Sequence, residues 1–154
     1  MHLYKKVIQK LIDKNLTIST AESCTGGLLA YCITRNKNAS KIYKGGYITY
    51  SNELKIRELK VKKITLKNFG AVSKETAKEM VNGLYIKSKT NISVSTTGIA
   101  GPDGGSKNKP VGLIYIGFSI NGKVNIFKKN FKGSRLQIQK KCVDFIFKYL
   151  NKLI

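Results

Sequence analysis

Residues 113–120 (LIYIGFSI) constrain the fold most tightly, because they form an almost continuous apolar run. A strand with apolar side chains on both faces needs cover from two sides, so this run predicts an internal strand of a sheet. Asn121-Gly122 follows directly, and this dipeptide favours a two-residue hairpin turn. Residues 123–131 are therefore predicted to run antiparallel to the apolar strand.

Helical and extended patterns alternate along the rest of the chain. Three further strands are predicted from β-branched or alternating residues, at 17–21, 46–50 and 92–96. Helices are predicted from apolar stripes and capping residues, at 2–14, at 25–34, after the caps Ser51 and Ser73, and from about Arg135. This order predicts an α/β fold: a three-layer α/β/α sandwich on a mixed, mostly parallel sheet with one antiparallel hairpin. The length of 154 residues fits a single domain over residues 1–154.

The composition argues against several classes of protein. No apolar run approaches the ~18 residues of a membrane span, and the N-terminus lacks a secretory pattern, so we expect a cytoplasmic protein with no membrane partner. The three cysteines, Cys24, Cys32 and Cys142, lack metal-ligand spacing. His2 is the only histidine, which argues against zinc sites and against triads with a histidine base.

The formal net charge of +21 points to anionic partners, but it does not identify one. Of the 29 basic residues only Arg35, Arg57 and Arg135 are arginines, whereas nucleic-acid readers favour arginine for bidentate contacts. The lysines are also spread along the whole chain. A solvated, lysine-rich surface is thus favoured over a nucleic-acid face. Its positive field would attract a phosphorylated small molecule.

The run AESCTGG at residues 21–27 places Ser23 between a predicted strand and a predicted helix. Backbone N–H groups at a helix start are unpaired and can bind an anion or a developing oxyanion. Ser23 can serve there as a nucleophile, or only as the N-cap of the helix, which is the commoner task of such a serine. The local pattern favours the cap.

A second glycine-rich segment, TTGIAGPDGGS at residues 96–106, leaves the end of a predicted strand. Open α/β sheets place their ligands at this kind of position, and long loops in compact domains often have functions. The segment lacks the lysine and spacing of a phosphate-binding Walker loop. It predicts a second wall for a site that contains Ser23.

Four blocks give the chain a family resemblance: AESCTGG (21–27), GGYITYSNELK (45–55), GAVSKETAKEM (70–80) and TTGIAGPDGGSKNKPVG (96–112). In this order they resemble the CinA C-terminal domain family. The resemblance implies a stand-alone amidohydrolase that converts nicotinamide mononucleotide, a phosphorylated nucleotide, to nicotinic acid mononucleotide and ammonia. It implies no metal and no organic cofactor.

The resemblance also implies roles for individual residues. Ser23 would be the nucleophile, Lys55 the general base and Tyr50 the residue that relays or orients the proton. Lys55 can act as a base only if its pKa falls toward neutrality through burial. The oxyanion would be held by backbone N–H groups around residues 25–27 or by those of Thr97-Gly98.

The implied substrate-binding residues are Thr25, Gly26, Gly27, Asn52, Thr97, Gly98 and Arg135. Arg135, at the start of the last helix, would grip the phosphate. Here the chain departs from the family, which usually has an acidic or amide residue where this chain has Ser134.

Two alternatives stay open at this stage. One is a catalytically silent module of the same fold that binds a nucleotide or phosphosugar; the other, less favoured, is a basic nucleic-acid-associated protein. The sequence leaves the oligomeric state open, with a homodimer or a higher homo-oligomer among the options.

Overall fold

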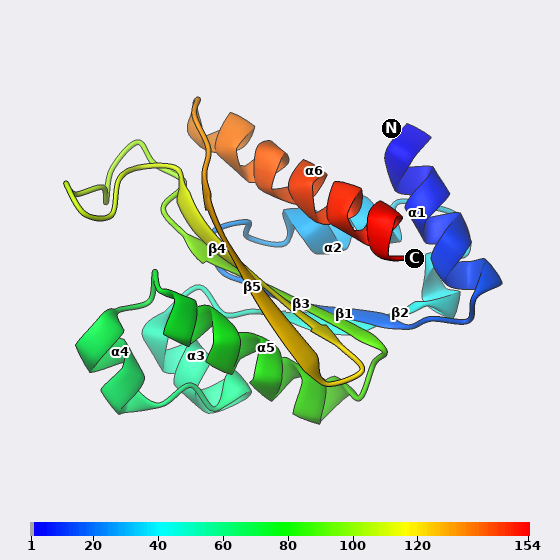
Figure 1. Cartoon of the computed structure of the whole chain (residues 1–154), viewed down its shortest axis with the longest axis horizontal. Coiled ribbons are helices and arrows are strands. Elements are labelled where there is room, and N and C mark those ends of the chain that lie inside the picture. The colour runs from blue at the N-terminus through cyan, green and yellow to red at the C-terminus, as the bar shows by residue number, and fades with distance from the viewer. Residues whose placement is uncertain (1) are drawn as a thin grey trace.

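The computed structural model describes residues 2–154 and contains a five-stranded sheet with the order β2-β1-β3-β4-β5 (Figure 1). The strands are β1 (Ile18–Glu22), β2 (Tyr43–Ile48), β3 (Ile92–Gly98), β4 (Leu113–Ile120) and β5 (Lys123–Asn130). β1 pairs in parallel with β2 and β3, whereas β4 pairs antiparallel with β3 and with β5. The mixed sheet and its hairpin are confirmed, and β3–β4 is a second antiparallel pair.

Helices cover both faces of the sheet (Figure 1). They are α1 (His2–Asp13), α2 (Leu28–Thr34), α3 (Asn52–Leu59), α4 (Lys63–Phe69), α5 (Lys74–Ser88) and α6 (Arg135–Leu153), with the short 3-10 helix η1 (Ala39–Lys41). α1, α2 and α6 lie on one face, and α3, α4 and α5 lie on the other. The predicted three-layer sandwich is therefore confirmed. No helix within residues 2–154 is long and apolar enough to cross a membrane.

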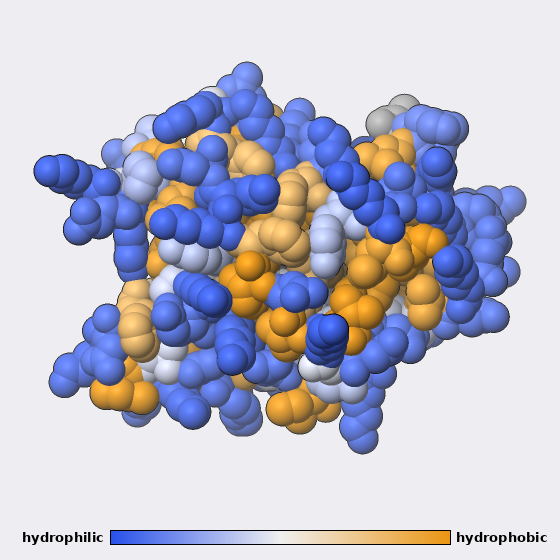
Figure 2. Space-filling model, in the orientation of Figure 1, coloured by the Kyte–Doolittle hydropathy of each residue, from blue (hydrophilic) through white to orange (hydrophobic). Residues whose placement is uncertain are grey.

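Apolar burial is unequal on the two faces. The larger core lies beneath α1, α2 and α6 and includes Phe118 and Phe147, both almost fully buried. A smaller cluster under α3 and α5 includes Leu59, Met80 and Leu84. Hydrophilic side chains rim the face shown in Figure 2 and interrupt its apolar surface.

Two predicted boundaries are wrong. β2 occupies residues 43–48, so the segment 49–51 is a connection and not the end of the strand. α2 begins at Leu28 and not at residue 25, because Gly26 (φ 57°) and Gly27 (φ 100°) adopt left-handed backbone conformations that interrupt a right-handed helix. α4 has no counterpart among the predicted elements.

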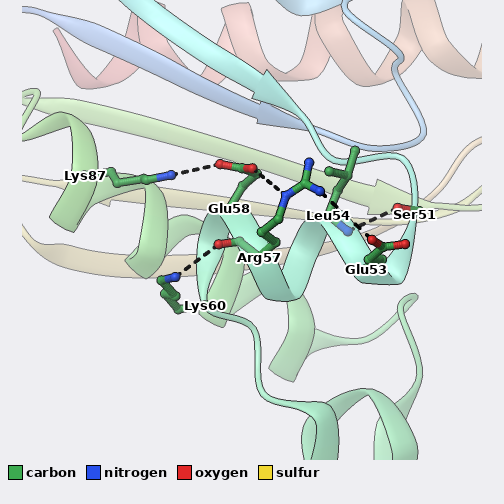
Figure 3. A network of polar contacts seen from close by, with 7 residues as sticks. All are labelled: Ser51, Glu53, Leu54, Arg57, Glu58, Lys60 and Lys87. Carbon is green, nitrogen blue, oxygen red and sulfur yellow. Dashed lines mark hydrogen bonds and ion pairs between the residues drawn. The ribbon is translucent and has the colours of Figure 1, made fainter.

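α3 is fixed to α5 on its outer side (Figure 3). Glu58 accepts a hydrogen bond from Lys87 Nζ at 3.0 Å and one from Arg57 Nε at 2.9 Å. Ser51 caps the helix, since its hydroxyl accepts from the Leu54 N–H at 3.1 Å, as predicted. These outward-facing contacts leave the opposite side of α3 directed into the protein.

Candidate active site

Ser23 directly follows β1 and lies at the carboxyl end of this internal strand. Its N–H donates to the Thr96 carbonyl at 3.0 Å and so continues the β1–β3 ladder by one bond. The residue is 8% exposed. Ser23 does not cap α2, because Gly27 occupies the N-cap position and no side chain caps the helix from there. The prediction of a capping serine is wrong, and the Ser23 hydroxyl has a different partner.

That partner is Lys55, which projects inward from α3. Lys55 Nζ lies 3.0 Å from Ser23 Oγ and 2.8 Å from the Thr49 carbonyl oxygen. The contact joins the two residues to which the family resemblance assigns the roles of nucleophile and general base. Lys55 is only 1% exposed, and none of the ion pairs within residues 2–154 includes it.

Burial changes the acid–base chemistry of Lys55. Desolvation of the ammonium group lowers the pKa of Lys55 from 10.5 to about 8. A substantial fraction of this lysine is then neutral under mildly alkaline conditions, and a neutral amine can accept a proton from a serine hydroxyl 3.0 Å away.

The Ser23–Lys55 pair opens into a cleft of about 320 Å³. Among the predicted site residues, those that line it are Ser23, Tyr50, Asn52, Lys55, Thr97, Gly98 and Arg135. Three others, Thr25, Gly26 and Gly27, are not part of its lining. The segment 99–104 supplies the opposite wall that the glycine-rich pattern predicts.

Tyr50 and Arg135 meet at the exposed rim of the cleft. Arg135 Nη2 donates to the Tyr50 hydroxyl at 2.9 Å, and Nη1 donates to the Gly101 carbonyl at 2.6 Å. Tyr50 is 62% exposed. Within the described residues the Tyr50 hydroxyl has no hydrogen bond to Ser23 or Lys55, and Lys55 contacts Ser23 directly.

Two donors of the turn between β1 and α2 already have partners. The Gly26 N–H donates to the Ser23 carbonyl at 3.0 Å. The Thr25 hydroxyl donates to Glu22 Oε1 at 2.6 Å and lies 2.8 Å from Thr96 Oγ1. Thr25 is thus directed into the protein and away from the cleft.

Cys24, next to Ser23, is not a competing nucleophile. Burial raises the pKa of its thiol to about 12, so the thiol stays protonated near neutral pH. Within residues 2–154 no group of three His, Cys, Asp or Glu side chains could hold a metal ion.

Comparison with known proteins decides the family. The CinA C-terminal domain matches residues 1–154 of the chain. The chain belongs to the CinA C-terminal domain family. A competence-damage inducible protein of Clostridium acetobutylicum is 50% identical over 144 residues, which is 94% of this chain and 35% of that protein. The chain spans about a third of the length of such relatives.

Solved structures of the CinA family have the same fold. The competence/damage inducible protein CihA from Agrobacterium tumefaciens superposes with a TM-score of 0.94 at 38% identity, covering 99% of this chain and 93% of that one. A CinA superfamily protein from Klebsiella pneumoniae gives a TM-score of 0.94 at 30% identity, covering 98% and 94%.

Two further residues near the Ser23–Lys55 pair of this CinA domain, Thr49 and Glu22, were not predicted. The Thr49 carbonyl, which accepts from Lys55, lies in the connection after β2, and no sequence pattern marks it. Glu22 stands inside the AESCTGG motif beside Ser23, yet nothing in the local pattern shows that its side chain is buried. Its position next to the serine was the available signal.

Proposed function

We propose that this chain is an amidohydrolase that converts nicotinamide mononucleotide to nicotinic acid mononucleotide and ammonia. The observation that carries the proposal is the buried contact of 3.0 Å between Lys55 Nζ and Ser23 Oγ at the cleft. Membership of the CinA C-terminal domain family is consistent with it. A lysine with a pKa near 8 provides the base that a chain with one histidine otherwise lacks.

In the first half of the reaction, neutral Lys55 takes the Ser23 hydroxyl proton while Oγ attacks the carboxamide carbon. The resulting tetrahedral oxyanion collapses, and its C–N bond breaks. The proton held by Lys55 passes to the leaving nitrogen, so ammonia departs and the acyl group remains on Ser23 as an ester.

In the second half, water attacks the ester carbonyl while Lys55 accepts its proton. The C–O bond to Ser23 then breaks, and the proton on Lys55 returns to Ser23 Oγ. Nicotinic acid mononucleotide leaves, and both residues regain their starting protonation states. The net reaction consumes one amide and one water and needs no redox partner.

The oxyanion requires a donor that is not already used. Ser23 N–H to Thr96 O is the last bond of the β1–β3 ladder, and the next donor on that edge of β3 is the Gly98 N–H. In a continued ladder the Gly98 N–H would donate to the Ser23 carbonyl, but that carbonyl accepts from the Gly26 N–H instead. We assign the oxyanion to the Gly98 N–H, because Gly98 also lines the cleft.

The rest of the cleft would bind the nucleotide. Arg135 supplies a guanidinium for the phosphate, while Asn52 and Thr97 offer polar side chains along the lining. When the phosphate takes Arg135 as its partner, the Tyr50 hydroxyl loses the bond it now accepts. It can then orient or relay a proton at the reacting centre.

The test is ammonia release from nicotinamide mononucleotide by the wild-type protein, Ser23→Ala and Lys55→Met. We expect turnover by the wild type and a loss of at least about 10³-fold in each variant. Lys63→Met, on the exposed surface of α4, is the control and should retain activity. Unchanged turnover by Ser23→Ala would exclude Ser23 as the nucleophile. Calorimetric binding without turnover by the wild type would favour a binding module.

A further inference from the structure

Glu22, the last residue of β1, is a buried carboxylate that the reaction above does not use. It is 1% exposed, and no ion pair within residues 2–154 includes it. Its charge is instead satisfied by three hydrogen bonds. Oε1 accepts from the Thr25 hydroxyl at 2.6 Å and from the Leu29 N–H at 2.9 Å, and Oε2 accepts from the Ala30 N–H at 3.0 Å.

Two of these donors belong to the first turn of α2, where a helix normally needs a cap. Gly27, at the N-cap position, has no side chain to supply one. Glu22 therefore does what the sequence pattern assigns to Ser23. Because the carboxylate satisfies the helix, the Ser23 hydroxyl is free to pair with Lys55.

Glu22 also fixes the turn that holds Ser23 against β3. The Thr25 hydroxyl has one proton, which it donates to Glu22, so Thr96 must be the donor in the 2.8 Å contact between the two threonine hydroxyls. The Thr96 carbonyl accepts from the Ser23 N–H at 3.0 Å. One chain of hydrogen bonds thus runs from Glu22 through Thr25 to Thr96, the residue that anchors the Ser23 backbone.

We propose that Glu22 is a positioning residue that holds Ser23 opposite Lys55 by capping α2 in its place. This inference rests on the proposed function of Ser23 as a nucleophile. It predicts that loss of the carboxylate slows attack by Ser23 and leaves substrate affinity largely unchanged, since Glu22 does not line the cleft.

The chain provides a matched control for the loss of stability. Glu79 of α5 also holds the start of a helix, α4: Oε2 accepts from the N–H of the N-cap residue Lys62 at 2.8 Å and Oε1 from the Thr65 hydroxyl at 2.6 Å. No residue of that arrangement lines the cleft. Glu22→Gln and Glu79→Gln each replace one acceptor oxygen by an amide nitrogen of similar size, so both disturb a helix cap but only one lies beside Ser23.

The experiment measures the rate at which a fluorophosphonate probe labels Ser23, by mass spectrometry of the digested peptides, together with kcat and KM for ammonia release. Both are measured below the unfolding temperature of every variant. We expect Glu22→Gln to lower the labelling rate and kcat by on the order of tenfold to a hundredfold, with KM within about threefold of wild type. Glu79→Gln should match the wild type. Thr25→Val removes the middle of the chain of hydrogen bonds but keeps the carboxylate, so it should slow labelling by several-fold. This variant replaces Glu22→Gln as the test if Glu22→Gln does not fold.

Equal labelling rates for Glu22→Gln and Glu79→Gln would overturn the proposal, as would wild-type protein whose Ser23 is labelled no faster than exposed Ser51. Labelling of Ser23 without ammonia release would instead overturn the proposed substrate. The labelling rates of the variants would still decide the role of Glu22.

Discussion

Arg135 Nη2 donates to the Tyr50 hydroxyl at 2.9 Å and so connects the start of α6 to the segment between β2 and α3. A cation is unfavourable at a helix N-terminus, where the helix dipole is positive. Two acceptors compensate here, the Tyr50 hydroxyl and the Gly101 carbonyl. The N-terminus of α6 itself is satisfied by Ser134 and Gln137, which form a capping box. Arg135 is thus held over the cleft independently of the helix cap.

The first prediction concerns phosphate recognition by Arg135. Arg135→Ala should raise KM for nicotinamide mononucleotide by about 10- to 100-fold, since a charge-assisted hydrogen bond contributes roughly 1.5–3 kcal/mol. Nicotinamide riboside, which lacks the phosphate, should show much less change. Steady-state assays with both substrates provide the comparison. Arg57→Ala, on the outer side of α3, is the control, and an equal effect on both substrates would contradict the role of Arg135.

The second prediction concerns the Tyr50 hydroxyl. If it orients or relays a proton once the phosphate has engaged Arg135, Tyr50→Phe should lower kcat by about 10- to 100-fold. KM should change less, because the ring remains in the cleft. The variant should also lose most of its kcat advantage for the mononucleotide over the riboside. Wild-type kcat in Tyr50→Phe would show that the hydroxyl only tethers Arg135.

The third prediction is the pH profile. Ser23 is activated only by neutral Lys55, and burial lowers the pKa of Lys55 to about 8. The specificity constant kcat/KM should therefore rise with pH and level off above pH 8. On the acidic side, a plot of log(kcat/KM) against pH should have a slope of one. Ammonia release between pH 6 and 10 measures this curve. A midpoint below pH 6, or an activity that falls through pH 8, would argue against a lysine base.

The fourth prediction concerns the stability cost of the same lysine. Below pH 8 Lys55 is charged in both the folded and unfolded states, so the folded protein bears the penalty of a buried ammonium group. Between pH 8 and 10.5 the unfolded chain still binds the proton that the folded protein has released, so stability rises with pH. Lys55→Met should be more stable than wild type by about 1–2 kcal/mol at pH 7, after allowance for the two lost hydrogen bonds.

Chemical denaturation at pH 7 and at pH 10.5 tests this, with Lys63→Met as the exposed control. The difference between Lys55→Met and wild type should shrink at the higher pH. A variant less stable than wild type at both pH values would mean that the hydrogen bonds to Ser23 and Thr49 outweigh the buried charge.

Local sequence patterns predicted most of the sheet. The strand at residues 113–120 and its Asn121-Gly122 hairpin were identified from apolar continuity and turn chemistry, both short-range signals. The Ser73 cap was also correct, since its hydroxyl accepts from the Thr76 N–H at 3.1 Å. Such signals operate within a few residues, so they do not depend on the rest of the fold.

The errors arose where the folded arrangement of side chains, and not a local pattern, decides the structure. Ser23 matched the pattern of a cap, but the carboxylate of Glu22 folds back to the first turn of α2 and takes that role. Lys55 is one lysine among 26, and only its burial on the inner side of α3 distinguishes it from a solvated residue. The family resemblance named Lys55; the local pattern alone did not.

The last prediction tests how Lys55 is placed. Gly83 of α5 lies so close to α3 that a Cβ built on it would be 1.9 Å from the Leu59 carbonyl oxygen. Gly83→Ala favours the helix by about 1 kcal/mol, but the clash must push α3 outward, so we expect a net destabilisation of about 1–3 kcal/mol. Because Lys55 lies one turn before Leu59, its distance to Ser23 should increase and ammonia release should fall. Ile86→Ala, at an exposed position of the same helix, is the control and should change neither stability nor ammonia release. A Gly83→Ala protein with wild-type stability and activity would show that α3 does not need this close contact to hold Lys55.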